Sequence, residues 1–205
     1  FDMYNKRVMA LSDERCCRYA DLVIASSRTL YDRCRKVNGN TGLVLHGVDH
    51  AHFAGGLSAA RPPDMPEGQI VGFFGLLSEW LDQELVVQVA KELPEVSIVM
   101  IGAADVPVEK LKDVSNIHLL GPRRFAALPA YASHFTVGII PFLVNELTAA
   151  VNPIKLREML AAGCPVVSTA LPEVENYLAA ESEAENGALA AARVARDAGQ
   201  FVELV

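Results

Sequence analysis

The sequence has no excess of basic residues that could attract polyanions to its surface. Of its 205 residues, 18 are Lys or Arg and 25 are Asp or Glu, which gives a net charge of −7 at pH 7. This balance argues against nucleic acid or anionic lipid as a partner, so any phosphate group must be bound at a local site. Because 51% of the residues are apolar, the chain can bury a hydrophobic core.

Long apolar runs and regularly spaced cysteines are also missing. The longest apolar segment, Phe135–Val144, is interrupted by a glycine and a proline, and it is shorter than the ~20 residues of a membrane-spanning helix. The four cysteines show neither a metal-ligand spacing nor a disulfide framework: Cys16, Cys17, Cys34 and Cys164. We therefore expect a protein of the reducing cytoplasm.

From residue 66 onward, short apolar runs alternate with amphipathic helical patterns. We expect strands at 69–74, 96–101, 116–120, 135–140, 165–168 and 191–195. We expect helices at 79–93, 108–114, 126–132, 153–162 and from 197 onward. Apolar runs without strict alternation are typical of strands covered on both faces. The pattern therefore predicts an α/β fold with a Rossmann-like, doubly wound parallel sheet.

The first part of the chain has a different organisation. A charged helical pattern covers residues 1–20, and a strand, a helix and a second strand are expected at 21–26, 27–36 and 42–46. Glycine, proline and small residues then dominate from residue 54, which is typical of a linker. We divide the chain into 1–53, a linker at 54–65 and a domain at 66–205. Both ends fall within helical patterns, which indicates a piece of a longer protein.

The first candidate site is the turn after strand 69–74. Gly72 lies in the strand, Gly75 at its end, and Leu76 and Ser78 lead toward the next helix. Ligands of open α/β sheets bind at the carboxyl ends of the strands. Gly75 would let a ligand approach the backbone, and the following helix would offer free amides. The alternative is that the two glycines serve only a tight connection between strand and helix, because a lone Gly-x-x-Gly is a weak signal.

The second candidate site is the start of helix 153–162, at Asn152, Pro153, Ile154, Lys155 and Glu158. Asn152 is a favourable N-cap and Pro153 suits the first helical position. The amides of Ile154 and Lys155, the helix dipole and the lysine charge together form an anion site. Glu158 shares a helical face with Lys155 and could accept hydrogen bonds from sugar hydroxyls. The alternative is a capped surface helix with a Lys–Glu pair.

One competing protein class is disfavoured by the sequence, and several other conspicuous residues have structural explanations. A Rossmann dehydrogenase is disfavoured, because the sequence has no G-x-G-x-x-G and the second strand ends Met100-Ile101-Gly102, with no acidic residue placed to hold a ribose. Arg123 and Arg124 are expected to form a solvated loop pair, Trp80 to pack at a helix start, and Cys164 to be unreactive beside a buried strand.

Several stretches of the sequence resemble known glycosyltransferases. Residues 19–53, with YADLVIASS followed by LHGVD, resemble the segment in which the first domain of a GT-B glycosyltransferase ends. Strand 70–75 and the stretch NPIKLREMLAAGCPVVST at 152–169 resemble the donor-binding domain of its retaining nucleotide-sugar group, and LPEV at 171–174 continues the match. The chain is thus identified as part of a group 1, family 4-like glycosyltransferase.

The resemblance assigns roles to individual residues. Glu158 matches the second of two glutamates that this group often has, the one that holds the ribose of the nucleotide. The first would fall at Ala150, and Asn-Pro-x-Lys at 152–155 instead resembles a subgroup of teichuronic-acid, capsule and exopolysaccharide transferases. The usual Arg and Lys are missing from 76–83. Lys155 and Glu158 are therefore the implied catalytic residues, with the amides near Gly75 as further diphosphate ligands.

The resemblance also implies a reaction. A sugar would pass with retention from a nucleoside diphosphate to a glycan or lipid-linked acceptor in cell-surface polysaccharide synthesis, without a metal ion or other cofactor. The acceptor and any contact with the inner face of the membrane would belong to the missing part of the first domain, so this piece is expected to be inactive. Two alternatives stay open: a non-catalytic nucleotide-binding module, consistent with Ala150, and a nucleotide-sugar epimerase.

Overall fold

A six-stranded, fully parallel sheet forms the larger part of the molecule. The computed structural model describes residues 3–184 and 191–205. The strands follow one another as β3 (Ile70–Phe74), β4 (Ser97–Ile101), β5 (Ile117–Gly121), β6 (Val137–Ile140), β7 (Val166–Thr169) and β8 (Ala192–Ala195). In the sheet their order is β5-β4-β3-β6-β7-β8. The predicted α/β class with a doubly wound parallel sheet is confirmed.

The chain changes direction across the sheet between β3 and β6. It runs outward from β3 through β4 to β5 and then returns to the opposite side of β3, where Val71 pairs with Val137 and Gly72 with Gly138. In open α/β sheets this reversal point opens a crevice at the carboxyl ends of the strands, where ligands bind. The topology thus places the ends of β3 and β6 at the natural ligand position.

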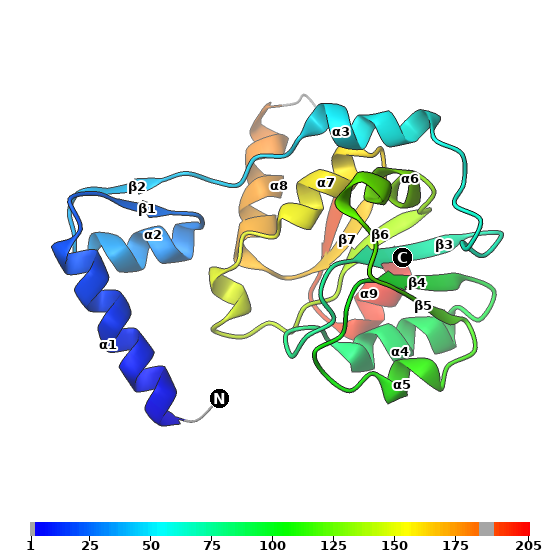
Figure 1. The fold of residues 1–205 in the computed structure, drawn as a ribbon, viewed down its shortest axis with the longest axis horizontal. Coiled ribbons are helices and arrows are strands. Elements are labelled where there is room, and N and C mark those ends of the chain that lie inside the picture. Colours follow the sequence, from blue (N-terminus) through cyan, green and yellow to red (C-terminus); the bar gives the residue numbers. More distant parts are fainter. Residues whose placement is uncertain (1–2, 185–190) are drawn as a thin grey trace.

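Helices cover both faces of the sheet (Figure 1). One layer contains α4 (Gln83–Glu92), α5 (Glu109–Lys112) and α9 (Ala198–Leu204). The other contains α3 (His50–Ala54), α6 (Leu128–Ala132) and α7 (Ile154–Ala161), and α8 (Pro172–Ala184) connects β7 to β8. No helix in the described ranges has the length and apolar character needed to cross a membrane.

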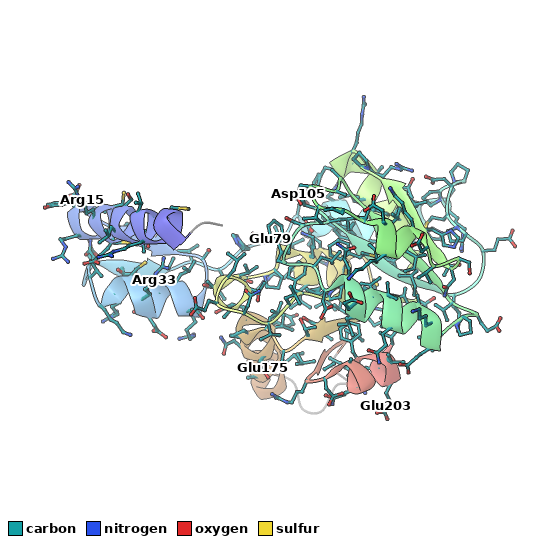
Figure 2. All side chains as sticks on the ribbon, turned by 90° about the horizontal axis from the view of Figure 1, so that it is seen from below. Arg15, Arg33, Glu79, Asp105, Glu175 and Glu203 are labelled. Carbon is teal, nitrogen blue, oxygen red and sulfur yellow. The ribbon has the colours of Figure 1, made fainter. Side chains whose placement is uncertain are left out.

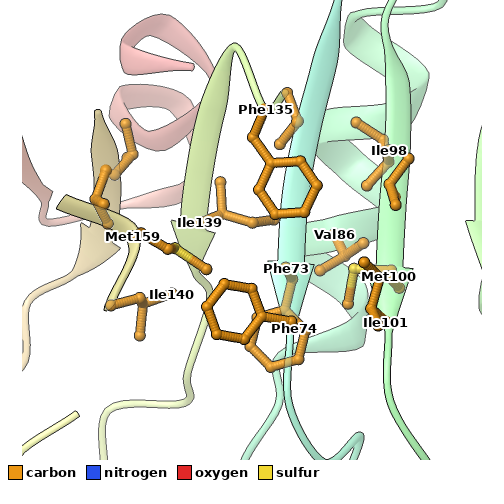
Figure 3. Close-up of a cluster of buried hydrophobic side chains, with 14 of the residues drawn as sticks. Phe73, Phe74, Val86, Ile98, Met100, Ile101, Phe135, Ile139, Ile140 and Met159 are labelled. Carbon is orange, nitrogen blue, oxygen red and sulfur yellow. The ribbon is translucent and has the colours of Figure 1, made fainter. Parts of the chain in front are cut away.

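The core lies between these two layers. All five residues of β3 are buried, as the uninterrupted apolar run predicted. Figure 3 shows Phe73 and Phe74 among side chains from β4, β6 and α7, including Ile98, Ile139 and Met159. Helix α4 starts later than the predicted helix at 79, because the carboxylate of Asp82 accepts a hydrogen bond from Leu85 N (2.9 Å) and caps the helix there.

The first part of the chain forms a small separate sheet, seen on the left in Figure 1. Helix α1 (Met3–Tyr19) and α2 (Arg28–Arg35) flank a parallel pair of short strands, β1 (Val23–Ala25) and β2 (Thr41–Leu43). This unit touches the larger sheet at the start of α2, where Ser27 Oγ donates to Ala150 O (2.7 Å).

The segment 54–65, interpreted from its composition as a linker, is ordered in the structure. It contains the 3-10 helix η1 (Gly55–Ser58) and packs against α6. Gly56 lies so close to α6 that a Cβ atom would stand 2.2 Å from Pro129 O. Just before it, Phe53 of α3 is fully buried in the core of the larger sheet. The connection therefore runs along the larger part of the molecule as part of its surface layer.

Candidate functional site

The turn after β3 brings two backbones into close contact at the reversal point. Gly75 has φ +144° and Gly102, at the end of β4, has φ +155°. Gly75 N donates to Ile101 O (2.8 Å), and a Cβ atom at Gly102 would lie 1.8 Å from Gly75 O. The positive φ favours glycine at both positions, and at Gly102 the neighbouring backbone also leaves no space for a side chain. The ends of β3 and β4 thus form a side-chain-free floor.

Lys155 lies directly over this floor. A Cβ atom placed on Gly75 would stand 2.1 Å from Lys155 Cε and 2.8 Å from Lys155 Nζ. The first turn of α7 therefore stands beside the Gly75 turn, as the sequence predicted. The amides of Ile154 and Lys155 belong to the first turn of a helix and have no intrahelical acceptor. Backbone donors and an ammonium group converge at this point, which suits a phosphate anion.

The predicted cap of α7 is wrong. The helix starts at Ile154 with Pro153 as its N-cap, and no side chain caps it. Asn152, which is 5% exposed, instead donates from Nδ2 to Ser26 O (3.0 Å) and accepts from Arg157 at Oδ1 (2.9 Å). Its side chain is therefore occupied by contacts with the first part of the chain, and the amides at the helix start are left for another acceptor.

Glu158 is a buried carboxylate one turn further along α7. It is 8% exposed, and burial raises the pKa of its carboxyl group, although Lys155 and His52 oppose the rise. Burial likewise lowers the pKa of the Lys155 ammonium, against the influence of Glu158. In the part of the chain that the structure describes, neither side chain forms a hydrogen bond or an ion pair, not even with the other. Two opposite charges are thus held partly desolvated and unpaired.

Gly72 is explained by packing inside the sheet. It lies in the middle of β3, where a Cβ atom would stand 2.2 Å from the ring of Phe135. Core packing therefore accounts for this glycine without a ligand, and its donor-binding role stays a prediction. Leu76, by contrast, follows the Gly75 turn and is 39% exposed, and Ile154 at the start of α7 is 37% exposed. Both are apolar and contribute exposed surface beside the turn.

Ser78 lies on a neighbouring cavity. Its hydroxyl is buried and donates to Asp105 Oδ2 (3.0 Å). The cavity has a volume of about 460 Å³ and lies between the loops after β3 and β4, with Glu79, Asp82, Glu84 and Glu109 among its lining residues. Figure 2 shows Glu79 and Asp105 on the side of the larger sheet that is turned toward α1. The surrounding carboxylates disfavour a diphosphate in this cavity, and Lys155 is not among its lining residues.

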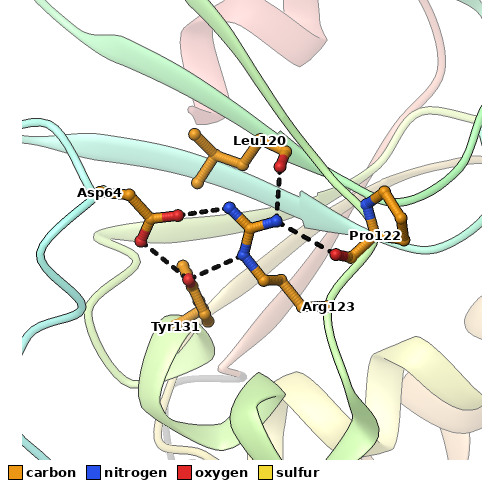
Figure 4. Close-up of polar contacts among 5 residues, drawn as sticks. All are labelled: Asp64, Leu120, Pro122, Arg123 and Tyr131. Atoms are coloured by element: carbon orange, nitrogen blue, oxygen red, sulfur yellow. Dashed lines mark hydrogen bonds and ion pairs between the residues drawn. The ribbon is translucent and has the colours of Figure 1, made fainter.

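Arg123 is not the solvated residue that the sequence predicted. Its guanidinium donates to the carbonyl oxygens of Leu120 (2.6 Å) and Pro122 (3.1 Å), to the hydroxyl of Tyr131 (3.0 Å) and to Asp64 (Figure 4). His52 of α3 is a second residue that sequence reasoning missed; it lowers the pKa of the Glu158 carboxyl against the effect of burial. No local signal identifies either residue, since their partners are distant in the sequence.

The geometry defines a class of protein. At the reversal point of the parallel sheet, helix amides and a lysine lie together, and an unpaired carboxylate follows one turn away on the same helix. This combination suits a ligand with both phosphate groups and neighbouring hydroxyl groups, which is the chemistry of a nucleotide-binding α/β domain.

Comparison with known proteins gives the family. The chain belongs to the glycosyl transferases group 1 family, whose model matches residues 68–205. It is 29% identical over 182 residues to the putative teichuronic acid biosynthesis glycosyltransferase TuaH of Bacillus subtilis (strain 168), an alignment that covers 82% of this chain and 45% of that relative. The chain therefore spans less than half the length of this relative.

Solved structures confirm the fold. The crystal structure of Anabaena Alr3699/HepE in complex with UDP and glucose has a TM-score of 0.65 and 18% identity, covering 100% of this chain and 56% of the other. The catalytic domain of starch synthase IV from Arabidopsis thaliana, bound to ADP and acarbose, has a TM-score of 0.64 and 12% identity, covering 92% and 48%. The six-stranded parallel sheet with its helices thus matches the fold of GT-B glycosyltransferases.

Proposed function

We propose that the protein transfers a sugar from a nucleoside diphosphate to a glycan or lipid-linked acceptor in cell-surface polysaccharide synthesis, with retention of anomeric configuration. The observation that carries this proposal is the pair of unpaired, desolvated charges at Lys155 and Glu158 beside the side-chain-free floor of Gly75 and Gly102. Keeping such charges without partners costs stability, so their presence is explained by a ligand that supplies the partners.

The two ends of the site would perform different tasks. Lys155 and the first-turn amides of α7 would bind the diphosphate and stabilise the charge that develops on the leaving phosphate as the bond to the sugar breaks. Glu158 would accept hydrogen bonds from the ribose hydroxyls. In this scheme the lysine and the helix start supply the positive charge, and no metal ion is required.

Two comparisons support the choice of substrate class. The relative in Bacillus subtilis is described as a putative teichuronic acid biosynthesis glycosyltransferase, and Anabaena HepE was solved with UDP and glucose. Asn-Pro-x-Lys at 152–155, which resembles the polysaccharide transferases, points to the same class. UDP is therefore the first nucleotide to test.

The proposal is tested by separating the two ends of the ligand. A thermal-shift screen with UDP, GDP, ADP, CMP and dTDP first identifies the base. Calorimetric titrations of the matching nucleoside and nucleoside diphosphate then compare the unaltered chain with Lys155→Ala and Glu158→Gln. A charge-assisted hydrogen bond contributes about 1.5–3 kcal/mol, so each substitution should weaken binding roughly ten- to a hundredfold.

The pattern of losses distinguishes the roles. Lys155→Ala should weaken binding of the diphosphate and spare the nucleoside, whereas Glu158→Gln should weaken both. Equal affinities for the unaltered chain and both variants would show that the start of α7 is only a surface helix. Without the rest of the acceptor domain, this chain is expected to bind donor nucleotides and to transfer no sugar.

A non-catalytic nucleotide-binding module is the second candidate. It is favoured by Ala150, which stands where the family often has its first glutamate and whose carbonyl oxygen accepts from Ser27 Oγ in the structure. Transfer assays with the whole protein distinguish the two candidates, because a binding module would hold the nucleotide sugar without consuming it.

A further inference from the structure

The segment that connects the two parts of the molecule touches the loop after β5 at two separate points. This connecting segment, residues 50–65, starts with α3 and runs over the layer of α6 and α7 toward the start of β3 (Figure 1). The loop, residues 122–127, leaves the carboxyl end of β5 and leads into α6. Its two attachments lie at opposite ends of the connecting segment.

The first attachment is centred on Arg123. Its guanidinium binds the carboxylate of Asp64 and the hydroxyl of Tyr131, and that hydroxyl donates to the second oxygen of Asp64 (2.8 Å). The same guanidinium also binds carbonyl oxygens at the end of β5 (Figure 4). The hydrogen bond from Arg123 holds the pKa of Asp64 below its ordinary value. Because the guanidinium group of Arg123 is planar and its donors have fixed directions, these acceptors together fix the position of the loop backbone.

The second attachment is a stack of aromatic rings. His52 lies parallel to Phe125 with ring centroids 4.6 Å apart and an interplanar angle of 18°. The buried ring of Phe53 meets Phe125 edge-on, with centroids 5.7 Å apart. His52 Nε2 also lies 3.3 Å from Phe125 O. Phe125 is nevertheless 55% exposed, so the stack holds an aromatic side chain at the surface in a fixed orientation.

His52 connects this stack to the donor site. The helix that carries it, α3, packs against α7, the helix that carries Glu158, and His52 opposes the rise that burial causes in the pKa of the Glu158 carboxyl. Along α7, Lys155 lies at the Gly75 turn and Glu158 one turn beyond it. If the diphosphate lies at Lys155 and the ribose at Glu158, the base must extend further in that direction, toward His52 and the loop at 122–127.

We propose that the connecting segment is a clamp that holds the loop at 122–127 in place for the nucleoside end of the donor, with Asp64 and Arg123 as positioning residues. This inference rests on the proposed function. Neither residue needs to touch the ligand. With the clamp intact, the loop at 122–127 is already ordered before the nucleoside binds. Binding then does not lose affinity to the ordering of the loop.

The test uses Asp64→Ala in the complete chain, with UDP and inorganic pyrophosphate as the two probes in calorimetric titrations. Releasing one or two loop residues, which must then be ordered on binding, should weaken UDP binding about tenfold. Pyrophosphate affinity should stay within about twofold of the unaltered chain, because an effect below 0.5 kcal/mol is expected at the Lys155 end. Asp64→Asn keeps an acceptor oxygen for Arg123 and Tyr131 and should restore most of the UDP affinity.

A matched control comes from α8. Glu175 is exposed to the same extent as Asp64 (38% and 37% of the side chain) and also pairs with an arginine, Arg196. Glu175→Ala removes one negative charge, as Asp64→Ala does, and should leave UDP binding unchanged. Tyr131→Phe removes a single hydroxyl from the clamp and should give a smaller loss than Asp64→Ala in a chain that stays folded.

The results of these titrations distinguish failure of the clamp from failure of the proposed function. Unchanged UDP affinity in folded Asp64→Ala and Tyr131→Phe overturns the clamp, as does an equal loss for UDP and pyrophosphate, while Lys155→Ala still tests the function independently. If UDP does not bind to the unaltered chain, the nucleoside diphosphate selected by the thermal-shift screen replaces it. If no nucleoside diphosphate binds, both the function and the clamp are wrong.

Discussion

Gly75→Ala should remove phosphate binding through a single methyl group. The new Cβ atom would stand 2.1 Å from Lys155 Cε and 2.8 Å from Lys155 Nζ, far inside van der Waals contact. The lysine side chain is long and flexible, so it can rotate away from the methyl group. The substitution should therefore move the ammonium group out of the position over the turn without changing any charged residue.

Gly75→Ala should have two separate effects, a loss of stability and a loss of UDP affinity. Gly75 has φ +144°, a conformation that costs an alanine on the order of 1–3 kcal/mol of stability. Displacing Lys155 removes a charge-assisted hydrogen bond to the ligand, which corresponds to about 1.5–3 kcal/mol, or roughly a ten- to hundredfold loss of UDP affinity. Urea unfolding measures the first effect, and calorimetric titration of the folded variant measures the second.

Gly72→Ala, three residues earlier, is the matched control. Its methyl group would stand 2.2 Å from the ring of Phe135, which is buried and cannot rotate away. Overpacking of this kind costs about 1–3 kcal/mol, but the site itself is not altered. Gly72→Ala should therefore lose stability and keep its UDP affinity while folded. If Gly75→Ala binds UDP as well as Gly72→Ala does, Lys155 does not hold the phosphates over this turn.

Two further predictions concern stability. Burial raises the pKa of the Glu158 carboxyl, so the folded chain holds the carboxyl proton more tightly than the unfolded chain does. The contribution of Glu158 to the free energy of unfolding therefore falls as the pH rises above the ordinary carboxyl range. Glu158→Gln should thus keep or raise the Tm at pH 7, with a difference from the unaltered chain that shrinks toward acid pH; a Tm lowered by several degrees at pH 7 would contradict this reasoning. Phe53→Ala should lower the free energy of unfolding by about 3–5 kcal/mol in urea, because Phe53 is fully buried in the core, and a loss below about 1 kcal/mol would show that α3 is not anchored there.

The regular elements could be predicted because their signals are local. Every strand of the larger sheet lies within two residues of an apolar run that the sequence shows. Helix α7 ends where predicted, because Gly163 adopts φ +75° and Cys164 N donates to Met159 O, which closes the helix in a Schellman motif. Lys155 beside Gly75 was predictable for a related reason, since the carboxyl ends of parallel strands meet at one edge.

The errors at single residues arise from contacts between distant parts of the chain. Asn152 has the residue type of an N-cap, but its amide is occupied by Ser26 O, 126 residues away in the sequence. Arg123 has the sequence context of a solvated loop residue, but the fold places Asp64 beside its guanidinium group. A residue type indicates which bonds a side chain can make, and the tertiary fold decides which of them it does make.

The charges of Lys155 and Glu158 stay apart because of Gly75. On an exposed helix, a lysine and a glutamate three residues apart would pair with each other, and the pair would have little affinity left for a ligand. Here the side chain of Lys155 extends over Gly75 into space that any other residue at that position would occupy. Each charge is then left without a partner in the described structure and is opposed by desolvation. The site therefore depends on a glycine at the end of β3 as much as on the two charged residues of α7, and this is why a methyl group at Gly75 should act like the loss of Lys155.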